Sequence, residues 1–225
     1  MAQARSAART TIIKVLVGSH AHGLADPDSD RDYRSVFVVP TVELFRLGFK
    51  YPATSWTKEH GDEAAWEIRP FLELALQCHP LILETFLAPL VEADRWGEEL
   101  RALFSAVWSP RKTYDAFIGY AINQRTKFLD KKDQRPEKYA AAYVRVLWNL
   151  CELLETGSFT VHIRDTAIGD RLWRIKHGEY RMGEIIDLGE ELTQKAAGLL
   201  YFCRHDADPA ALDAFLIRLR KAFLP

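Results

Sequence analysis

One stretch near the start of the chain restricts the fold more than any other: residues 15–39, VLVGSHAHGLADPDSDRDYRSVFVV. It contains two short runs rich in β-branched residues, separated by a Gly-Ser pair and a polar connector with glycine and proline. Runs bounded in this way are typical of β-strands. The sequence therefore predicts a strand, a tight turn at Gly18 and Ser19, a connector, and a second strand that ends before Pro40.

Two carboxylates stand at the start of the predicted second strand. Side chains alternate between the faces of a strand, so Asp30 and Asp32 are expected on one face and Arg31 on the other. Carboxylates held side by side repel each other unless a cation lies between them. A hard divalent ion such as Mg²⁺ prefers carboxylate oxygen and completes its shell with water and substrate phosphates. The pair therefore predicts a metal site.

The Gly-Ser turn adds a second chemical feature. Gly18 lets the backbone approach a phosphate closely, and the Ser19 hydroxyl with exposed N–H groups can hold an anion. By parity Arg34 shares the face of the two aspartates, where it either pairs with a carboxylate or approaches a phosphate. A phosphate-binding turn beside a metal-binding acid pair indicates nucleotidyl transfer. The alternative, a solvated Asp/Pro/Ser turn, leaves the Gly-Ser pair and the flanking strands unexplained.

These residues resemble a known signature. Gly18-Ser19, then Gly23, then Ser29-Asp30-Arg31-Asp32 are similar to the motif of the DNA polymerase β nucleotidyltransferase superfamily. The fuller segment, GSHAHGLADPDSDRDYRSVFVVP, resembles one branch in particular, the predicted nucleotidyltransferases found with RNA-repair and RNA-ligase genes of bacteria and phages. The resemblance implies nucleotide-binding roles at Gly18, Ser19, Ser29 and Arg34.

The resemblance also implies a fold. We expect an α+β protein in which residues 1–90 form the catalytic domain, with a small mixed sheet and flanking helices. A helical domain over residues 91–225 follows, and its clearest helix is predicted at 139–155, with Gly157 as the stop signal. The active site is expected between the two domains, where ligands commonly bind.

The superfamily uses a third carboxylate on a neighbouring strand, and the candidates are Asp62, Glu63 and Glu67. Glu67, just before a predicted helix, fits the branch pattern best as the third catalytic and metal-binding residue, with Asp62 as the alternative. A carboxylate in this position also suits a helix cap.

Three further residues receive roles. Lys176, in a Lys-His-Gly-Glu segment similar to one in the branch, is expected to contact phosphate. Glu84, within an apolar run, is interpreted as a buried structural acid with a basic partner such as Arg69. Arg145 interrupts an apolar helix, and it either faces the nucleotide cleft or forms an ion pair with Glu84 or Glu152.

The implied activity is transfer of a nucleoside monophosphate from an NTP, ATP among them, to a hydroxyl acceptor, with Mg²⁺ or Mn²⁺ as the metal. The resemblance suggests an RNA 3′ end in tRNA or RNA fragments as the acceptor. Two alternatives remain open: a protein or small-molecule acceptor, as in toxin–antitoxin nucleotidyltransferases, and a non-catalytic nucleotide-binding adaptor. The residues do not indicate the base, the acceptor or the oligomeric state.

Composition sets outer limits. The 225 residues carry a net charge of −1, so any RNA contact depends on a local basic patch such as the charged segment 131–138. Three scattered cysteines form neither a disulfide framework nor a zinc site and are typical of a reducing cytosol. No secretory signal or membrane span is expected. These features predict a cytoplasmic protein.

Overall fold

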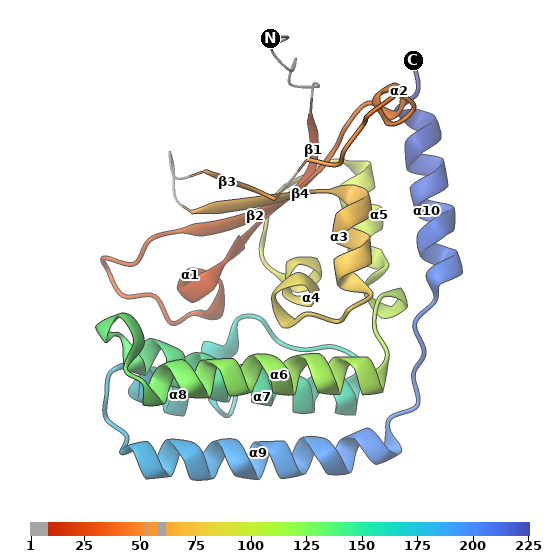
Figure 1. Cartoon of the computed structure of the whole chain (residues 1–225). Helices are drawn as coiled ribbons and strands as arrows, with labels where there is room; N and C mark the ends of the chain where they lie inside the picture. Colours follow the sequence, from red (N-terminus) through yellow and green to blue (C-terminus); the bar gives the residue numbers. More distant parts are fainter. Residues whose placement is uncertain (1–8, 53, 58–61) are drawn as a thin grey trace.

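The computed structural model describes residues 9–52, 54–57 and 62–225 (Figure 1). Within these residues the chain forms one sheet of five strands in the order β3-β4-β2-β1-β5. The strands are β1 (Thr10–Val17), β2 (Asp32–Val38), β3 (Ser55–Thr57), β4 (Glu63–Glu67) and β5 (Leu90–Ala93). β2 and β4 run parallel, whereas the other neighbouring pairs are antiparallel. The predicted α+β class with a small mixed sheet is confirmed.

The two central strands, β1 and β2, are the two strands predicted from residues 15–39. Ile12, Val15, Val36 and Val38 are fully buried, which explains why both strands are nearly continuous apolar runs. Their antiparallel register places Val17, the last residue of β1, opposite Asp32, the first residue of β2. The Gly-Ser turn therefore begins directly beside an aspartate.

Helices cover one face of the sheet, below it in Figure 1. They are α1 (Gly18–His22), α3 (Ile68–Ala75), α4 (Pro80–Leu87) and α5 (Arg95–Ala102), and a short α2 (Thr41–Leu44) lies at the far end of the sheet. Glu67, His79 and Asp94 precede three of these helices and accept backbone N–H groups of the first turn. Such caps satisfy N–H groups that have no partner within the helix.

A second layer consists of long helices, with α7 in the middle and α9 on the outside (Figure 1). The helices are α6 (Pro110–Leu129), α7 (Pro136–Thr156), α8 (Gly169–Lys176) and α9 (Met182–Phe202), with short 3₁₀ turns at Phe104–Ala106, Lys132–Gln134 and Ile163–Asp165. The predicted helix at 139–155 is α7, and Gly157 ends it in the left-handed conformation with φ +82°. α7 buries most of its side chains because α6, α8 and α9 all contact it.

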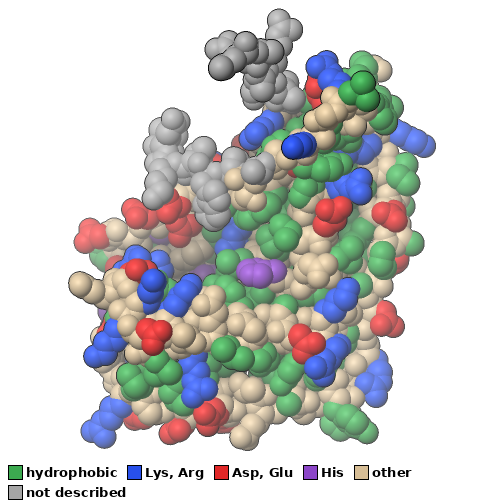
Figure 2. All heavy atoms as spheres, in the orientation of Figure 1, with side chains coloured by type: hydrophobic (Ala, Val, Ile, Leu, Met, Phe, Trp, Pro, Cys, Tyr) green, Lys and Arg blue, Asp and Glu red, His purple; other side chains and the backbone are tan. Residues whose placement is uncertain are grey.

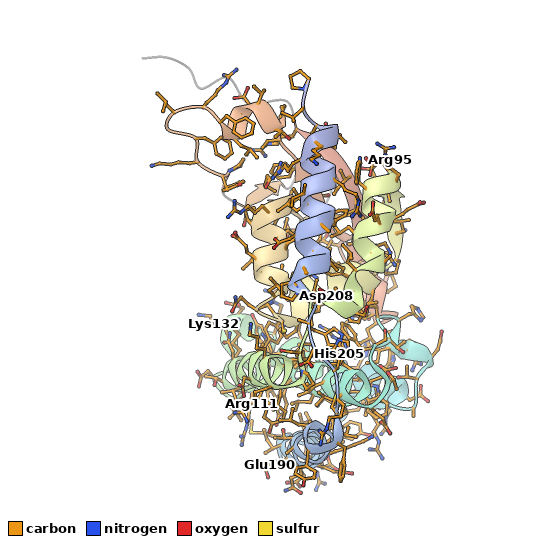
Figure 3. The ribbon with its side chains drawn as sticks, turned by 90° about the vertical axis from the view of Figure 1, so that its right-hand side faces the viewer. Arg95, Arg111, Lys132, Glu190, His205 and Asp208 are labelled. Atoms are coloured by element: carbon orange, nitrogen blue, oxygen red, sulfur yellow. The ribbon has the colours of Figure 1, made fainter. Side chains whose placement is uncertain are left out.

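The last helix, α10 (Pro209–Ala222), leaves the helical layer and returns to the sheet. Figure 3 shows it between α3 and α5, with Asp208 at its lower end. The Thr41 N–H donates to the Phe223 carbonyl at 3.0 Å, which ties the C-terminal segment to α2. The predicted boundary between a domain of residues 1–90 and a domain of residues 91–225 stays a prediction. However, β5 and α10, which lie mostly or wholly after residue 90, contact the sheet and its neighbouring segments.

Across the parts of the chain that the structure describes, none of the helices is both long and apolar enough to span a membrane.

Candidate functional site

The Gly-Ser turn is built against the first residue of β2. Gly18 has φ +70°, a conformation that L-residues with a side chain rarely adopt. A Cβ atom at this position would also collide with the carboxylate of Asp32. Glycine is therefore required at residue 18 for two separate reasons. The predicted turn coincides with the start of α1, because Gly18 and the half-buried Ser19 are the first two residues of that helix. Gly18 lies in contact with the predicted aspartate.

Three aspartates lie at this end of the sheet. Asp32 opens β2, Asp30 lies two residues before it, and Asp62 directly precedes β4. The Tyr33 N–H donates to the Asp62 carbonyl at 2.8 Å, and the parallel register pairs Tyr33 with the residue after Asp62. Asp62 is therefore next to Asp32 on the neighbouring strand.

The electrostatics of Asp32 follow from this arrangement. Burial raises the pKa of Asp32, and the negative charges of Asp62 and Asp30 raise it further. The positive charges of Lys138 and Arg34 lower the pKa, but the raising effects prevail. The chain thus maintains a partly buried carboxylate near other carboxylates, an arrangement that is unfavourable until a cation binds.

One detail of the prediction was wrong: Asp30 does not belong to the second strand. The segment before β2 is held in a turn, because the Ser29 N–H donates to the Asp26 carbonyl at 3.0 Å and the Asp26 N–H donates to the Ser29 hydroxyl at 2.9 Å. His20 Nε2 also lies 2.8 Å from the Ser29 carbonyl oxygen. The Ser29 hydroxyl, predicted to bind nucleotide, therefore serves to shape the connector that presents Asp30.

The structure does not bring Glu67, the predicted third carboxylate, to this site. Glu67 pairs with Phe37 at the other end of the β2–β4 ladder, and five residues of strand from Asp62 span about 17 Å. Its Oε2 accepts the Arg69 N–H at 2.9 Å, and its Oε1 lies 2.6 Å from Arg220 Nη2. Glu67 is a fully buried cap of α3 that is ion-paired to α10. The alternative, Asp62, is the acid that stands beside Asp32.

Arg34 shares the face of Asp32 as predicted, but its guanidinium is held by α4. Arg34 Nη1 lies 2.8 Å from Glu84 Oε2 and also donates to the Leu81 carbonyl. Glu84 additionally contacts His22 Nε2 at 2.5 Å and Arg145 Nη1 at 3.2 Å. Of the two predicted outcomes for Arg34, the structure shows pairing with a carboxylate.

The partner suggested for Glu84 was wrong, whereas the Glu84 option for Arg145 is confirmed. Arg69 pairs instead with Glu73 at 3.0 Å, one helical turn along α3. Short-range pairing of this kind is common on exposed helix faces. Burial alone would raise the pKa of Glu84, but its contacts with His22, Arg145 and Arg34 hold that pKa well below its usual range. Glu84 is therefore ionised inside the protein.

Lys176 is tied to the connector. Its ammonium group donates to the Asp26 carboxylate and to the Leu24 carbonyl, and His177 Nε2 lies 3.0 Å from the other carboxylate oxygen of Asp26. The hydrogen bond from Lys176 lowers the pKa of Asp26, and that from His177 acts in the same direction. The predicted phosphate contact at Lys176 stays a prediction, since the structure shows it fastening α8 to the segment before Asp30.

Lys138, in the first turn of α7, was not singled out from the sequence. It is exposed, and its positive charge lowers the pKa of Asp32, so it faces the aspartates from the helical half. Figure 2 shows a hollow on this side of the molecule, with acidic side chains on its upper rim and Lys and Arg side chains on its lower rim. The one signal available was the charged run 131–138, which the sequence predicts as a loop and a candidate basic patch.

The donor set suits a hard divalent cation. Asp32, Asp30 and Asp62 offer carboxylate oxygens only, and these are the ligands that Mg²⁺ prefers. Among the described residues no three acidic, histidine or cysteine side chains are gathered into a complete metal site. Mg²⁺ commonly binds through one or two carboxylates and takes its other ligands from water and substrate phosphates. The residues present therefore fit a metal that binds together with a nucleotide.

A mixed sheet with a glycine packed against an aspartate at the end of a central strand is the arrangement of nucleotidyltransferases of the DNA polymerase β type. The profile of the RNA repair pathway DNA polymerase beta family matches residues 2–173. This match covers most of the chain, and the protein therefore belongs to that family. The resemblance inferred from residues 18–40 is confirmed.

Two relatives give less information. An uncharacterised 38.9 kDa protein of Enterobacteria phage T4, from the nrdC–mobD intergenic region, is 23% identical over 134 residues. The match covers 52% of this chain but only 38% of the phage protein. A crystal structure of a nucleotidyltransferase-like protein from Exiguobacterium sibiricum aligns with 94% of this chain and 74% of its own, at 8% identity and a TM-score of 0.31. A score this low does not establish a common arrangement of elements.

Proposed function

We propose that this protein is a metal-dependent nucleotidyltransferase that moves a nucleoside monophosphate from an NTP to a hydroxyl acceptor. The observation that carries the proposal is the contact between Gly18 and Asp32, with Asp30 and Asp62 beside them. The turn allows close approach of a phosphate, and the aspartates supply a site for the cation that a triphosphate brings with it. Membership of a polymerase β-type family supports the same reaction.

In the proposed mechanism Asp32, together with Asp30 and Asp62, holds Mg²⁺ or Mn²⁺. When bound, the metal neutralises phosphate charge and lowers the pKa of the acceptor hydroxyl. Asp62 stands beside Asp32 and accepts the proton of that hydroxyl. The hydroxyl oxygen forms a bond to the α-phosphorus, the bond to the bridging oxygen breaks, and pyrophosphate leaves.

The remaining residues position the substrate. The backbone at Gly18 and Ser19 lies against the β- and γ-phosphates, and Lys138 contacts them from the helical half of the molecule. Most of the rate enhancement then comes from orientation and from fixed charges that act on the transferred phosphoryl group. Glu67 takes no part, because its carboxylate is engaged by Arg220 and the α3 cap.

We propose an RNA 3′ end as the acceptor. Support comes from the family, which is linked to an RNA repair pathway, and from the Lys and Arg side chains on the lower rim of the hollow. The protein as a whole has a net charge of −1, so RNA would be attracted by this local patch.

The test is a transfer assay. The protein is incubated with Mg²⁺ or Mn²⁺, each labelled NTP in turn, and a pool of tRNA and RNA fragments. An Asp30→Asn/Asp32→Asn variant is the control. We expect label in RNA that disappears in the control, and the active NTP identifies the base preference. Label on protein would show that the acceptor is a protein and not RNA. Absence of both label and Mg²⁺-dependent NTP binding would overturn the catalytic proposal.

A further inference from the structure

Four side chains from four elements meet below the sheet, and we call them the Glu84 cluster. They are His22 of α1, Arg34 of β2, Glu84 of α4 and Arg145 of α7. Glu84 is the centre, at 2.5 Å from His22, 2.8 Å from Arg34 and 3.2 Å from Arg145. The cluster connects the helix after the Gly-Ser turn, the strand that begins at Asp32, and the helical half of the molecule.

The charges in this cluster do not cancel. Two guanidinium groups face one carboxylate. Burial lowers the pKa of His22, and the charge of Arg145 lowers it further, whereas Glu84 raises it by a smaller amount. His22 is therefore neutral at neutral pH, and the cluster carries one positive charge in excess. The two arginine side chains are only 11% and 9% exposed. A charge in such surroundings is costly unless an anion accompanies it.

Neighbouring groups do not supply the missing negative charge. His79 and Tyr120 stack edge to face at 5.6 Å next to the cluster. Burial lowers the pKa of His79 and raises the pKa of Tyr120, so both are neutral at neutral pH. The charge of Arg34 also acts on Asp32, but within the described part of the chain Asp32 forms no ion pair with either arginine.

Both guanidinium groups retain free hydrogen-bonding capacity. A guanidinium has five N–H donors, and within the residues described here only Nη1 of Arg34 and Nη1 of Arg145 meet protein acceptors. A buried nitrogen without a partner would be an unsatisfied polar atom, and none of the other nitrogen atoms of Arg34 and Arg145 is of that kind. These atoms therefore reach solvent. Arg34 is two residues beyond Asp32 on the same face of β2, about 7 Å along the strand. Arg34 therefore connects the Glu84 cluster to the strand that begins at the aspartate site.

We propose that Glu84 holds Arg34 and Arg145 as a two-guanidinium site that binds a phosphate group of the substrate. The planar N–H pairs of arginine match phosphate oxygens, and the bound phosphate provides the anion that the cluster lacks. The proposal rests on the proposed function for the nature of the substrate. The phosphate belongs either to the triphosphate of the NTP or to the backbone of the RNA acceptor.

The experiment measures phosphate binding without catalysis. The background is the full chain with Asp30→Asn/Asp32→Asn, in EDTA, so that neither the metal nor its carboxylates contribute. Inorganic triphosphate and a short RNA oligonucleotide without a triphosphate are the two probes, each titrated alone by calorimetry. Arg145→Gln removes one guanidinium of the cluster. Arg220→Gln is the matched control, because it removes the guanidinium of another buried ion pair, with Glu67, at the far end of the sheet.

We expect Arg145→Gln to weaken binding of one probe by about 10- to 100-fold, the loss typical of a charged hydrogen bond, while Arg220→Gln leaves it unchanged. The affected probe identifies the source of the phosphate. Equal affinity in the parent and Arg145→Gln, or equal losses in both variants, would overturn the proposal. Thermal melting of each variant verifies that it is folded.

The outcome is independent of the transfer assay. If the unmodified protein transfers nucleotides but Arg145→Gln binds both probes normally, the two-guanidinium site is wrong and the proposed function stands. If transfer is absent but triphosphate binding depends on Arg145, the site stands and the proposed function is wrong.

Discussion

The two ends of the parallel β2–β4 ladder carry carboxylates in opposite situations. At the beginning of the ladder burial raises the pKa of Asp32, and the negative charges of Asp62 and Asp30 raise it further. At the other end Glu67 is more deeply buried, yet a guanidinium of Arg220 and a backbone N–H satisfy its two oxygens. The depth of burial therefore does not distinguish a binding site from a structural acid.

What distinguishes the two ends is the partner that the chain itself supplies. Glu67 is paired directly with an internal cation, whereas the charges of Lys138 and Arg34 do not offset the raised pKa of Asp32, which a bound cation would lower. On sequence grounds Glu67 was preferred over Asp62 as the third carboxylate, although a carboxylate before a helix also suits a helix cap. The following predictions test this comparison.

The largest expected effect separates Asp62 from Glu67 in catalysis. We expect Asp62→Asn to reduce nucleotidyl transfer by about 10³-fold, equivalent to about 4 kcal/mol of transition-state stabilisation, because it removes a carboxylate from the metal site. Glu67→Gln should retain transfer within a few-fold. Initial rates at saturating Mg²⁺ and NTP provide the measurement. The reverse result would return Glu67 to the site and remove Asp62 from it.

The next effect concerns stability and compares Glu84 with Glu67. Glu84→Gln leaves two buried guanidinium groups without their carboxylate, and we expect a loss of about 3–5 kcal/mol in the free energy of unfolding. Glu67→Gln leaves one guanidinium that is 12% exposed, and its amide oxygen can still cap α3, so we expect about 1–3 kcal/mol.

Urea unfolding of the two glutamine variants, followed by circular dichroism, measures both losses in the same background. Both substitutions are nearly isosteric, so the difference reports charge and not packing. An equal loss in the two variants would show that the number of cationic partners around Glu84 has no energetic consequence.

The smallest effect concerns Asp32 and pH. Its folded-state pKa lies above the unfolded value, so ionisation costs stability above that pKa, and the cost disappears as the pH falls through it. In metal-free protein at neutral pH, Asp32→Asn should therefore raise stability by roughly 0.2–1 kcal/mol, the size of one interaction between partly exposed charges. Melting temperatures in EDTA across acidic and neutral pH test this. A lower melting temperature for the variant at neutral pH would contradict it.

Local patterns predicted much of the fold. Gly18 and Ser19 begin the short helix α1, but the two strands of residues 15–39, the helix after Glu67 and the long α7 ending at Gly157 appear close to their predicted positions. Each depends on contacts between neighbours in the sequence, such as β-branched runs and a left-handed glycine at a helix end. The start of β2 was placed two residues early, because hydrogen bonds between Asp26 and Ser29 hold that segment in a turn.

The site was predicted less completely. Gly18 and Asp32 follow from one short motif, and the structure places them in contact. The choice between Asp62 and Glu67 needed the register of β2 against β4, which the sequence does not state. Lys138 and the partners of Glu84 come from helices that approach the motif only in the folded chain.

The sequence by itself determined the two central strands, the glycine between them and the aspartate that opens the second strand, because these depend on backbone conformation and side-chain alternation within a short segment. The tertiary structure alone decided which acid joins Asp32, which acid Arg220 neutralises, and where an excess positive charge collects. Those outcomes depend on long-range electrostatics and on strand register. Both arise only when segments 30 to 153 positions apart come together.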